Sequence, residues 1–429
     1  MEPHISTFPL DYTLNVYRDE INLMICCFQR FTRYFISLFD LFIPSEIIRL
    51  IILLYIDIKI FPSDYRIYCG EDDSLILYNG IIYTSGAKSC GQGSTHDSNG
   101  KKIKTFTEMS SFFSSNINKN NKIVSASIGS LHCSFIDNNG DLYMSGSNGF
   151  GQLGIHIGKK DQLPRFYHGP IQIMNIKNVI QSSCGKAHTF ILTKNGLFAA
   201  GDNLLGQLGL SKFNFPNDSF TLVSLNNVIN IKCKQNHSMI LTKEGLFGCG
   251  HNDFHQLGID SLEDKFNSFQ KININNIISF STGNDHSIVL TTEGLFMTGW
   301  RRNKIENAYS ITFIKISNRK DILSFSCGFG FSMVLTKTGL FNSGSNEFGE
   351  LGYHCSDQSD RSIESFKKVD IYGGLRNATS LSCGFSHTII DTDQGLYGCG
   401  LNNNNQLGLD GTFQYVETIH NFIKIPFKK

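Results

Sequence analysis

The side chains with the clearest chemical potential in this sequence are histidines that recur at similar distances along the chain. The set is His132, His188, His237, His286 and His387. Imidazole binds metals and transfers protons near neutral pH, so a converging set could form a metal site or a catalytic base. Copies that belong to separate repeat units converge only if they line a shared channel. We favour a structural role, a half-buried ring that is hydrogen-bonded within its own unit.

Asp and Asn side chains form a second candidate set, each close behind a glycine: Asp202, Asn203, Asn252 and Asn346. They could be calcium ligands, but short polar side chains more often close tight turns, and we favour turns. The sequence has no Gly-rich phosphate loop, no Ser/His/Asp spacing and no paired carboxylates. We therefore expect no enzyme, with no catalytic, cofactor-binding or metal site.

At least six of the twelve cysteines follow the same regularity, and Cys233 is one of them. Cys184, Cys327 and Cys383 each precede a glycine, and Cys249 and Cys399 share a Gly-Cys-Gly motif. Small buried side chains explain this pattern better than disulfides, and the paired C-x-x-C spacing typical of zinc sites does not occur. Residues 1–20 also lack the apolar core of a secretory signal. We expect a reduced, intracellular protein of the cytoplasm or nucleus.

The elements that carry these residues are copies of one repeat. The clearest copy runs from Cys184 to Gly209 and contains the segments His-Thr-Phe-Ile-Leu-Thr, Asn-Gly-Leu-Phe and Gly-Gln-Leu-Gly. An apolar run rich in strand formers, then Asn195-Gly196, predicts a hairpin with its tight turn at that pair. The leucine of the last segment is expected to fill the gap between adjacent units. Equivalent turn glycines recur at Gly80, Gly140, Gly196, Gly245, Gly294, Gly339 and Gly395.

Seven units spaced 45 to 60 residues apart favour a β-propeller. Helical repeat arrays lack this density of glycine turns, whereas a four-stranded blade fits the period. The expected fold is all-β, a seven-bladed propeller over residues 66–429, with a small, mainly helical segment over residues 1–65. Closing the ring removes exposed sheet edges, and we expect the tail from Phe413 to Phe427 to supply the strand that completes the first blade.

The pattern His-x-x-x-Leu-Thr, Gly-Leu-Phe, Gly-x-Asn and Gly-Gln-Leu-Gly resembles the regulator of chromosome condensation repeat. The resemblance covers about residues 66–429 and implies a seven-bladed propeller. It also implies a possible role as guanine-nucleotide exchange factor for a small GTPase, although the wedge loop and basic tail of that activity are not evident here. The fifth unit departs from the pattern, since Trp300-Arg301-Arg302 follows Gly299 and no Gly-Gln-Leu-Gly comes after. The sixth has Phe331 in place of histidine.

The departure in the fifth unit is our main candidate for partner binding. Trp300 is the only tryptophan of the chain and stands beside Arg301 and Arg302. Trp and Arg are frequent interface anchors, and breaks in a local rule tend to mark function. The alternative is a decayed blade that has repacked its tryptophan.

The N-terminal segment lacks the repeat but contains Ile43-Pro44-Ser45-Glu46, followed by an apolar run to Tyr55. Ser45 can cap a helix, and Glu46 suits its positive end. This helix resembles the opening helix of an F-box, which docks onto cullin adaptors, and its candidate contact residues are Ile47 and Leu50. The alternative is a helix that packs against the first blade. Because Leu41–Ile60 contains four charged residues, we expect no membrane span.

The charge balance completes these expectations. The chain has 38 Lys and Arg against 37 Asp and Glu, so nothing in the composition asks for nucleic acid or an anionic membrane as the main partner. The function we expect is a non-catalytic protein–protein interaction scaffold, with a ubiquitin-ligase substrate receptor as one version. The alternative is exchange activity on a small GTPase.

Overall fold

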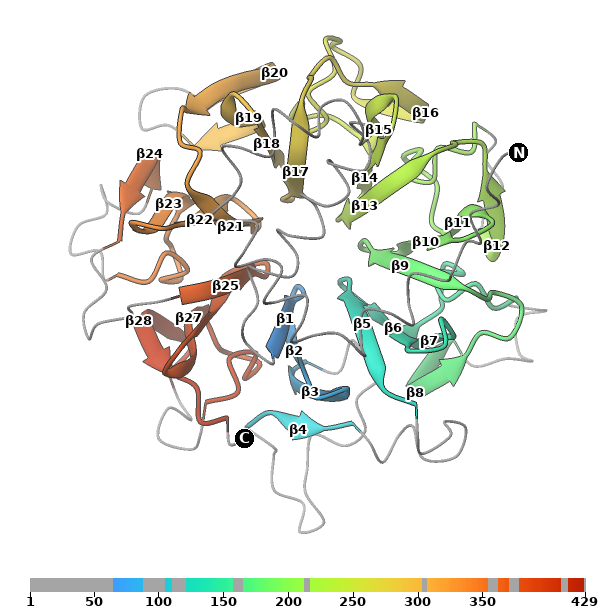
Figure 1. Ribbon diagram of the computed structural model, residues 1–429, viewed down its shortest axis with the longest axis horizontal. Coiled ribbons are helices and arrows are strands. Elements are labelled where there is room, and N and C mark those ends of the chain that lie inside the picture. Colours follow the sequence, from blue (N-terminus) through green and yellow to red (C-terminus); the bar gives the residue numbers. More distant parts are fainter. Residues whose placement is uncertain are drawn as a thin grey trace, which may run out of the picture. The chain divides into compact units, whose positions relative to one another are not determined.

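A computed structural model describes residues 65–87, 105–109, 121–156, 165–211, 217–302, 307–353, 362–369, 378–409 and 416–427. Within these ranges the chain forms seven antiparallel four-stranded sheets, the blades (Figure 1). The innermost strands contact one another in a closed cycle, from β1 through β5, β9, β13, β17, β21 and β25 back to β1. The predicted all-β, seven-bladed propeller is confirmed. Residues 1–64, with the predicted helix and its Ile47 and Leu50, lie outside the described residues.

Each blade is built from strands that are consecutive in the chain. The first three blades are β1 (Tyr65–Cys69), β2 (Asp73–Tyr78), β3 (Ile81–Gly86), β4 (Thr107–Glu108); β5 (Ile123–Ile128), β6 (His132–Asp137), β7 (Leu142–Ser147), β8 (Phe166–Gln172); and β9 (Val179–Cys184), β10 (His188–Thr193), β11 (Gly196–Gly201), β12 (Asn217–Val223).

The next two are β13 (Val228–Lys234), β14 (His237–Thr242), β15 (Gly245–His251), β16 (Lys265–Lys271), and β17 (Ile277–Thr282), β18 (His286–Thr291), β19 (Gly294–Arg302), β20 (Asn307–Ser317). The last two are β21 (Ile322–Cys327), β22 (Phe331–Thr336), β23 (Gly339–Ser345), β24 (Ser362–Lys368), and β25 (Ala378–Cys383), β26 (His387–Thr392), β27 (Gly395–Leu401), β28 (Thr418–Lys424).

The chain closes its ring without exchanging a strand, which corrects our expectation for the C-terminal tail. β28 pairs with β27 inside the seventh blade, and the first blade takes its outer strand from Thr107–Glu108. The seam between these two blades is held by side chains and turns. Tyr65 and Phe427 pack edge to face with ring centroids 5.7 Å apart, and Phe385 N donates to Gly70 O at 3.0 Å.

The predicted hairpin is present, but its turn is shifted by one residue. Thr193 pairs with Gly196, so Lys194 and Asn195 form the turn and Gly196 begins the return strand with φ of 140°. Thr193 Oγ1 accepts from Asn195 N at 3.0 Å and donates to Gly196 O at 3.1 Å. A hydroxyl that satisfies two turn groups explains why threonine ends this strand in blades three to seven.

The leucine of the Gly-Gln-Leu-Gly segment fills the gap between blades, as predicted. Leu208 is fully buried and packs with Phe190 and Leu197 of its own blade and with Ile231 and Ile240 of the next. Burying such a side chain contributes roughly 1.5–3 kcal/mol. The equivalent residues are equally buried: Leu153, Leu257, Leu351 and Leu407.

Two faces of the propeller follow from the direction of the strands. The inner strands end on one face, for example at Cys184, and the Gly-Gln-Leu-Gly loops lie on the same face; we call it the loop face. The opposite face carries turns such as Lys194–Asn195 and the linkers between blades; we call it the hairpin face. Every inner strand runs from the hairpin face to the loop face, so a residue's strand position fixes its face.

Candidate interaction site

Four of the five recurring histidines form hydrogen bonds to the neighbouring blade, which corrects the expected bond within a blade. Their rings are buried, with His132 and His188 fully inaccessible. His188 Nε2 lies 2.9 Å from Ser238 Oγ of the next blade, and Ser238 Oγ donates to Gln207 O at 2.8 Å. Because that hydroxyl has one proton, it accepts from Nε2–H, which fixes the neutral tautomer. The same bond joins His132 to Thr189, His286 to Ser332 and His387 to Ser74.

The burial of these rings sets their protonation. Burial lowers the pKa of His132 and His188 to about 3, and that of His286 to about 4. They are therefore neutral at physiological pH and serve as inter-blade hydrogen-bond donors. Among the described residues, no group of three or more His, Cys, Asp or Glu is placed to hold a metal ion.

The Asp and Asn set forms turns, as we favoured. Asn203 Oδ1 accepts from Leu208 N at 2.9 Å and Asn252 Oδ1 accepts from Leu257 N at 3.2 Å. Asn346 Oδ1 accepts from Leu351 N at 2.9 Å, and Asp202 Oδ1 accepts from Leu204 N at 3.0 Å. These bonds shape the loops that carry the plugging leucines.

The cysteines before the blade glycines are buried and unbridged. Their backbone amides tie each inner strand to the preceding blade. Cys184 N donates to Ser127 Oγ at 3.0 Å, and Cys69 N donates to Ser382 Oγ at 3.0 Å across the seam. Burial raises the pKa of Cys69 to about 11, so this thiol stays protonated and is a poor nucleophile.

Lys234 is the site residue that our sequence reasoning missed. Six inner strands end with a glycine at this position, and blade four has Lys234. The glycine is needed where the histidine ring packs against it, because a Cβ at Gly185 would lie 2.1 Å from His188 Cε1. His237 of blade four correspondingly has no described partner for Nε2, and Ser287 Oγ is also unpaired. The glycine found at this position in the other six blades was the sequence signal that could have identified Lys234.

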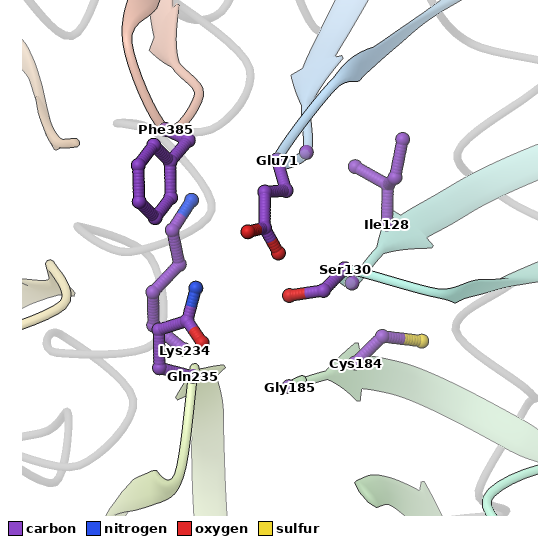
Figure 2. Close-up of a pocket in the computed structure, with 10 residues that line it drawn as sticks. Glu71, Ile128, Ser130, Cys184, Gly185, Lys234, Gln235 and Phe385 are labelled. Atoms are coloured by element: carbon purple, nitrogen blue, oxygen red, sulfur yellow. The ribbon is translucent and has the colours of Figure 1, made fainter. Parts of the chain in front are cut away.

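Lys234 reaches into the mouth of the central channel on the loop face. Figure 2 shows its side chain with Glu71, Ser130, Gln235 and Phe385 around one space. Burial lowers the pKa of the ammonium, and nearby thiols and Glu71 oppose that shift. Phe385 stacks on Phe329 with ring centroids 4.2 Å apart. The cavity volume is about 10 Å³, room for about one water molecule and far below the 300–1,000 Å³ typical of small-molecule pockets.

The fifth blade carries the most prominent feature of the loop face. Four other blades pair one residue beyond the equivalent glycine, as His251 does with Lys265, whereas β19 and β20 continue to pair for three residues beyond Gly299. Trp300, Arg301 and Arg302 pair with Tyr309, Ala308 and Asn307, respectively. The two additional pairs, at Arg301 and Arg302, correspond to about 7 Å of extra strand. The strand pairing of this blade is complete and extended, and Trp300, Arg301 and Arg302 are adjacent along that extension.

The fold and its inter-blade bonds define the class: a seven-bladed β-propeller assembled from one repeated unit. Residues 139–192 match the family model of the regulator of chromosome condensation (RCC1) repeat. The resemblance found in the sequence is confirmed: one stretch of the chain matches the RCC1 repeat model, and the described residues form a seven-bladed propeller.

Several known proteins are similar to part of this chain. The human X-linked retinitis pigmentosa GTPase regulator is 37% identical over 93 residues, which is 21% of this chain and 9% of that protein. Human WBSCR16 has a TM-score of 0.65 at 20% identity, over 77% of this chain and 88% of that chain. Prp20p from Saccharomyces cerevisiae has a TM-score of 0.64 at 19% identity, over 79% and 83%. These two structural likenesses concern the fold.

The described residues contain no helix long and apolar enough to cross a bilayer.

Proposed function

We propose that this propeller is a non-catalytic protein–protein interaction scaffold whose partner contacts the loop face through the β19–β20 hairpin. The observation that carries the proposal is the pairing of Arg301 and Arg302, which continues two residues beyond the pairing described for the other blades. Natural repeats lose their consensus where a loop has acquired a role of its own. A strand-paired hairpin on a rigid disc presents its residues with little loss of entropy on binding.

Affinity capture from lysate tests this proposal. Arg301→Glu plus Arg302→Glu is expected to abolish capture of the partner, whereas the matched pair Lys194→Glu plus Lys243→Glu on the hairpin face leaves it intact. Equal capture by both double variants and the unchanged chain refutes the hairpin as the contact. Thermal unfolding of each variant verifies that the disc remains folded.

A small-GTPase regulator is the second candidate. It is favoured by the similarity to the human X-linked retinitis pigmentosa GTPase regulator and to Prp20p, which binds Gsp1p and histones. Nucleotide-release kinetics on a panel of small GTPases should then show acceleration that Arg301→Glu plus Arg302→Glu removes. Unchanged release across the panel excludes exchange activity and leaves the scaffold proposal standing.

The ubiquitin-ligase version depends on Ile47 and Leu50, which lie outside the described residues. Pull-down of cullin adaptors is expected to be lost on Ile47→Asp plus Leu50→Asp. Retention of the adaptors by this variant, or their absence from the unchanged chain, removes this version.

A further inference from the structure

One position of the outer strands holds lysine in four consecutive blades. It is the residue that pairs with the aromatic side chain of the Gly-Leu-Phe or Gly-Leu-Tyr segment in the third strand. In blades four to seven the pairs are Lys271 with Phe247, Lys315 with Phe296, Lys368 with Phe341 and Lys424 with Tyr397. All four lysines are exposed. In blades one to three the equivalent residues are Glu108, Gln172 and Leu222. The lysines therefore form an arc over one side of the ring.

The lysine side chains extend toward the hairpin face. Each lies over the glycine that begins the third strand of its own blade: a Cβ on Gly294 would meet Lys315 Cε at 3.2 Å, and one on Gly395 would meet Lys424 Cε at 3.7 Å. Those glycines directly follow the hairpin turns. The ammonium groups consequently reach the edge of the hairpin face.

Other cations enlarge this arc into a basic sector. The hairpins and linkers of blades four to seven add Lys243, Arg319, Lys320 and Lys337, and Lys367 precedes Lys368 on β24. Among the described residues, the exposed acids of the same face in these blades are Glu244, Glu293, Asp321 and Asp393. Asp321 is already paired with Arg319 at 3.2 Å, which leaves the excess of positive charge on the lysines.

The loop face is close to neutral. Its loops in blades three to five carry Asp202, Asp253, Asp260, Glu263 and Asp264, against the cations Lys186, Lys265, Arg301 and Arg302. The net charge of +1 therefore conceals a concentration of positive charge on the hairpin face of blades four to seven. A face with its own field can attract a partner of opposite sign even in a neutral protein.

Exposed aliphatic side chains adjoin the basic sector. The hairpin face of blades two and three holds Met174, Leu222, Ile180 and Val124, which are 69%, 58%, 56% and 42% exposed. Leu222 occupies the same repeat position as the arc lysines. A face that joins diffuse positive charge to exposed aliphatic groups has the composition of surfaces that lie on membranes.

We propose that the hairpin face docks peripherally onto an anionic lipid membrane. The cations are mainly lysines spread over four blades. Bidentate recognition of discrete phosphates or carboxylates favours the planar fork of arginine instead. Lysines near an anionic leaflet each strengthen binding about five-fold, and the aliphatic groups of blades two and three can enter the headgroup region. This docking leaves the loop face and its β19–β20 hairpin open, so it does not depend on the proposed scaffold function.

Vesicle sedimentation tests the proposal with the full chain. The probe is vesicles of phosphatidylcholine with about 30% phosphatidylserine, compared with phosphatidylcholine alone, at two salt concentrations. Lys271→Gln, Lys368→Gln and Lys424→Gln together should weaken binding to the anionic vesicles about 100-fold. The matched triple variant on the loop face, Arg165→Gln, Lys186→Gln and Lys265→Gln, should bind like the unchanged chain.

A second variant separates the aliphatic contribution from charge. Met174→Gln plus Leu222→Gln leaves the net charge unchanged and should still reduce binding to the anionic vesicles. The proposal is overturned if the unchanged chain does not bind these vesicles, if both triple variants lose binding equally, or if only duplex DNA or polyglutamate is bound. Because all the altered side chains are exposed, equal melting temperatures establish that every variant is folded.

Discussion

Replacing His188 by phenylalanine should make the relative stability of the protein reverse with pH. The change removes the 2.9 Å bond to Ser238 and keeps the buried ring. Blade six already accommodates phenylalanine at this position, where Phe331 is buried beside Gly328. Ser238 Oγ keeps its acceptor, Gln207 O. At pH 7.5 we therefore expect a cost of about 1 kcal/mol, the net value of one hydrogen bond.

Acid changes the sign of that difference. Burial, together with the neighbouring histidines, lowers the pKa of His188 in the folded protein to about 3, against about 6.5 in the unfolded chain. A lowered folded pKa means that the unfolded state binds the extra proton, so His188 stabilises the fold fully above pH 6.5 and progressively less as the pH falls. Between pH 7.5 and pH 5 the loss is about 2 kcal/mol for one such histidine.

Equilibrium urea unfolding at the two pH values measures both effects. The unchanged protein should be more stable at pH 7.5 by about 1 kcal/mol, and the His188→Phe variant should be more stable at pH 5 by a similar amount. His168→Phe, at an exposed position, serves as the control. A stability difference that is the same at both pH values would falsify the buried, neutral state of His188.

Three further changes probe the repeat. Lys234→Gly restores the residue of the other six blades and should raise the urea midpoint, by about 1 kcal/mol of stability; a lowered midpoint would mean that the lysine is not what displaces the histidine of its blade. Leu208→Ala should cost about 2–5 kcal/mol in urea unfolding, since it leaves a cavity between two blades, and a cost below 1 kcal/mol would contradict the plug. Gly196→Val should cost more than about 1 kcal/mol in thermal unfolding, because φ is 140° and its Cβ would meet a leucine methyl at 3.0 Å. An unchanged Tm would speak against that turn.

The sequence was sufficient to predict the blades because their determinants are local. A strand, a turn and Gly196 lie within a few residues of one another, so a repeated pattern reveals each hairpin and the number of copies. The burial of Leu208 between blades also followed, because an apolar residue inside a polar loop needs a neighbour to cover it. The turn position was wrong by one residue, since threonine can satisfy two turn groups.

The contacts between blades were harder to predict, because they join residues about 50 positions apart. His188 bonds to Ser238, which directly follows the histidine of the next unit, and a His-Ser or His-Thr dipeptide gives no direct sign of this relation. Lys234 is unremarkable until the glycines of the other blades are aligned with it. The concentration of positive charge on the hairpin face depends on strand direction, so composition alone suggested that an anionic surface was not a main partner.

The seam between the first and seventh blades has a consequence for circular permutation of the chain. Ser382 and His387 hold Cys69 and Ser74 there by the same bonds that join other neighbours, and no sheet spans the junction. Each blade is thus an uninterrupted stretch of chain. New termini could be cut into any inter-blade linker, with a tether joining the present ends, and every sheet would keep its own strands. A circularly permuted ring should therefore fold with all seven junctions intact.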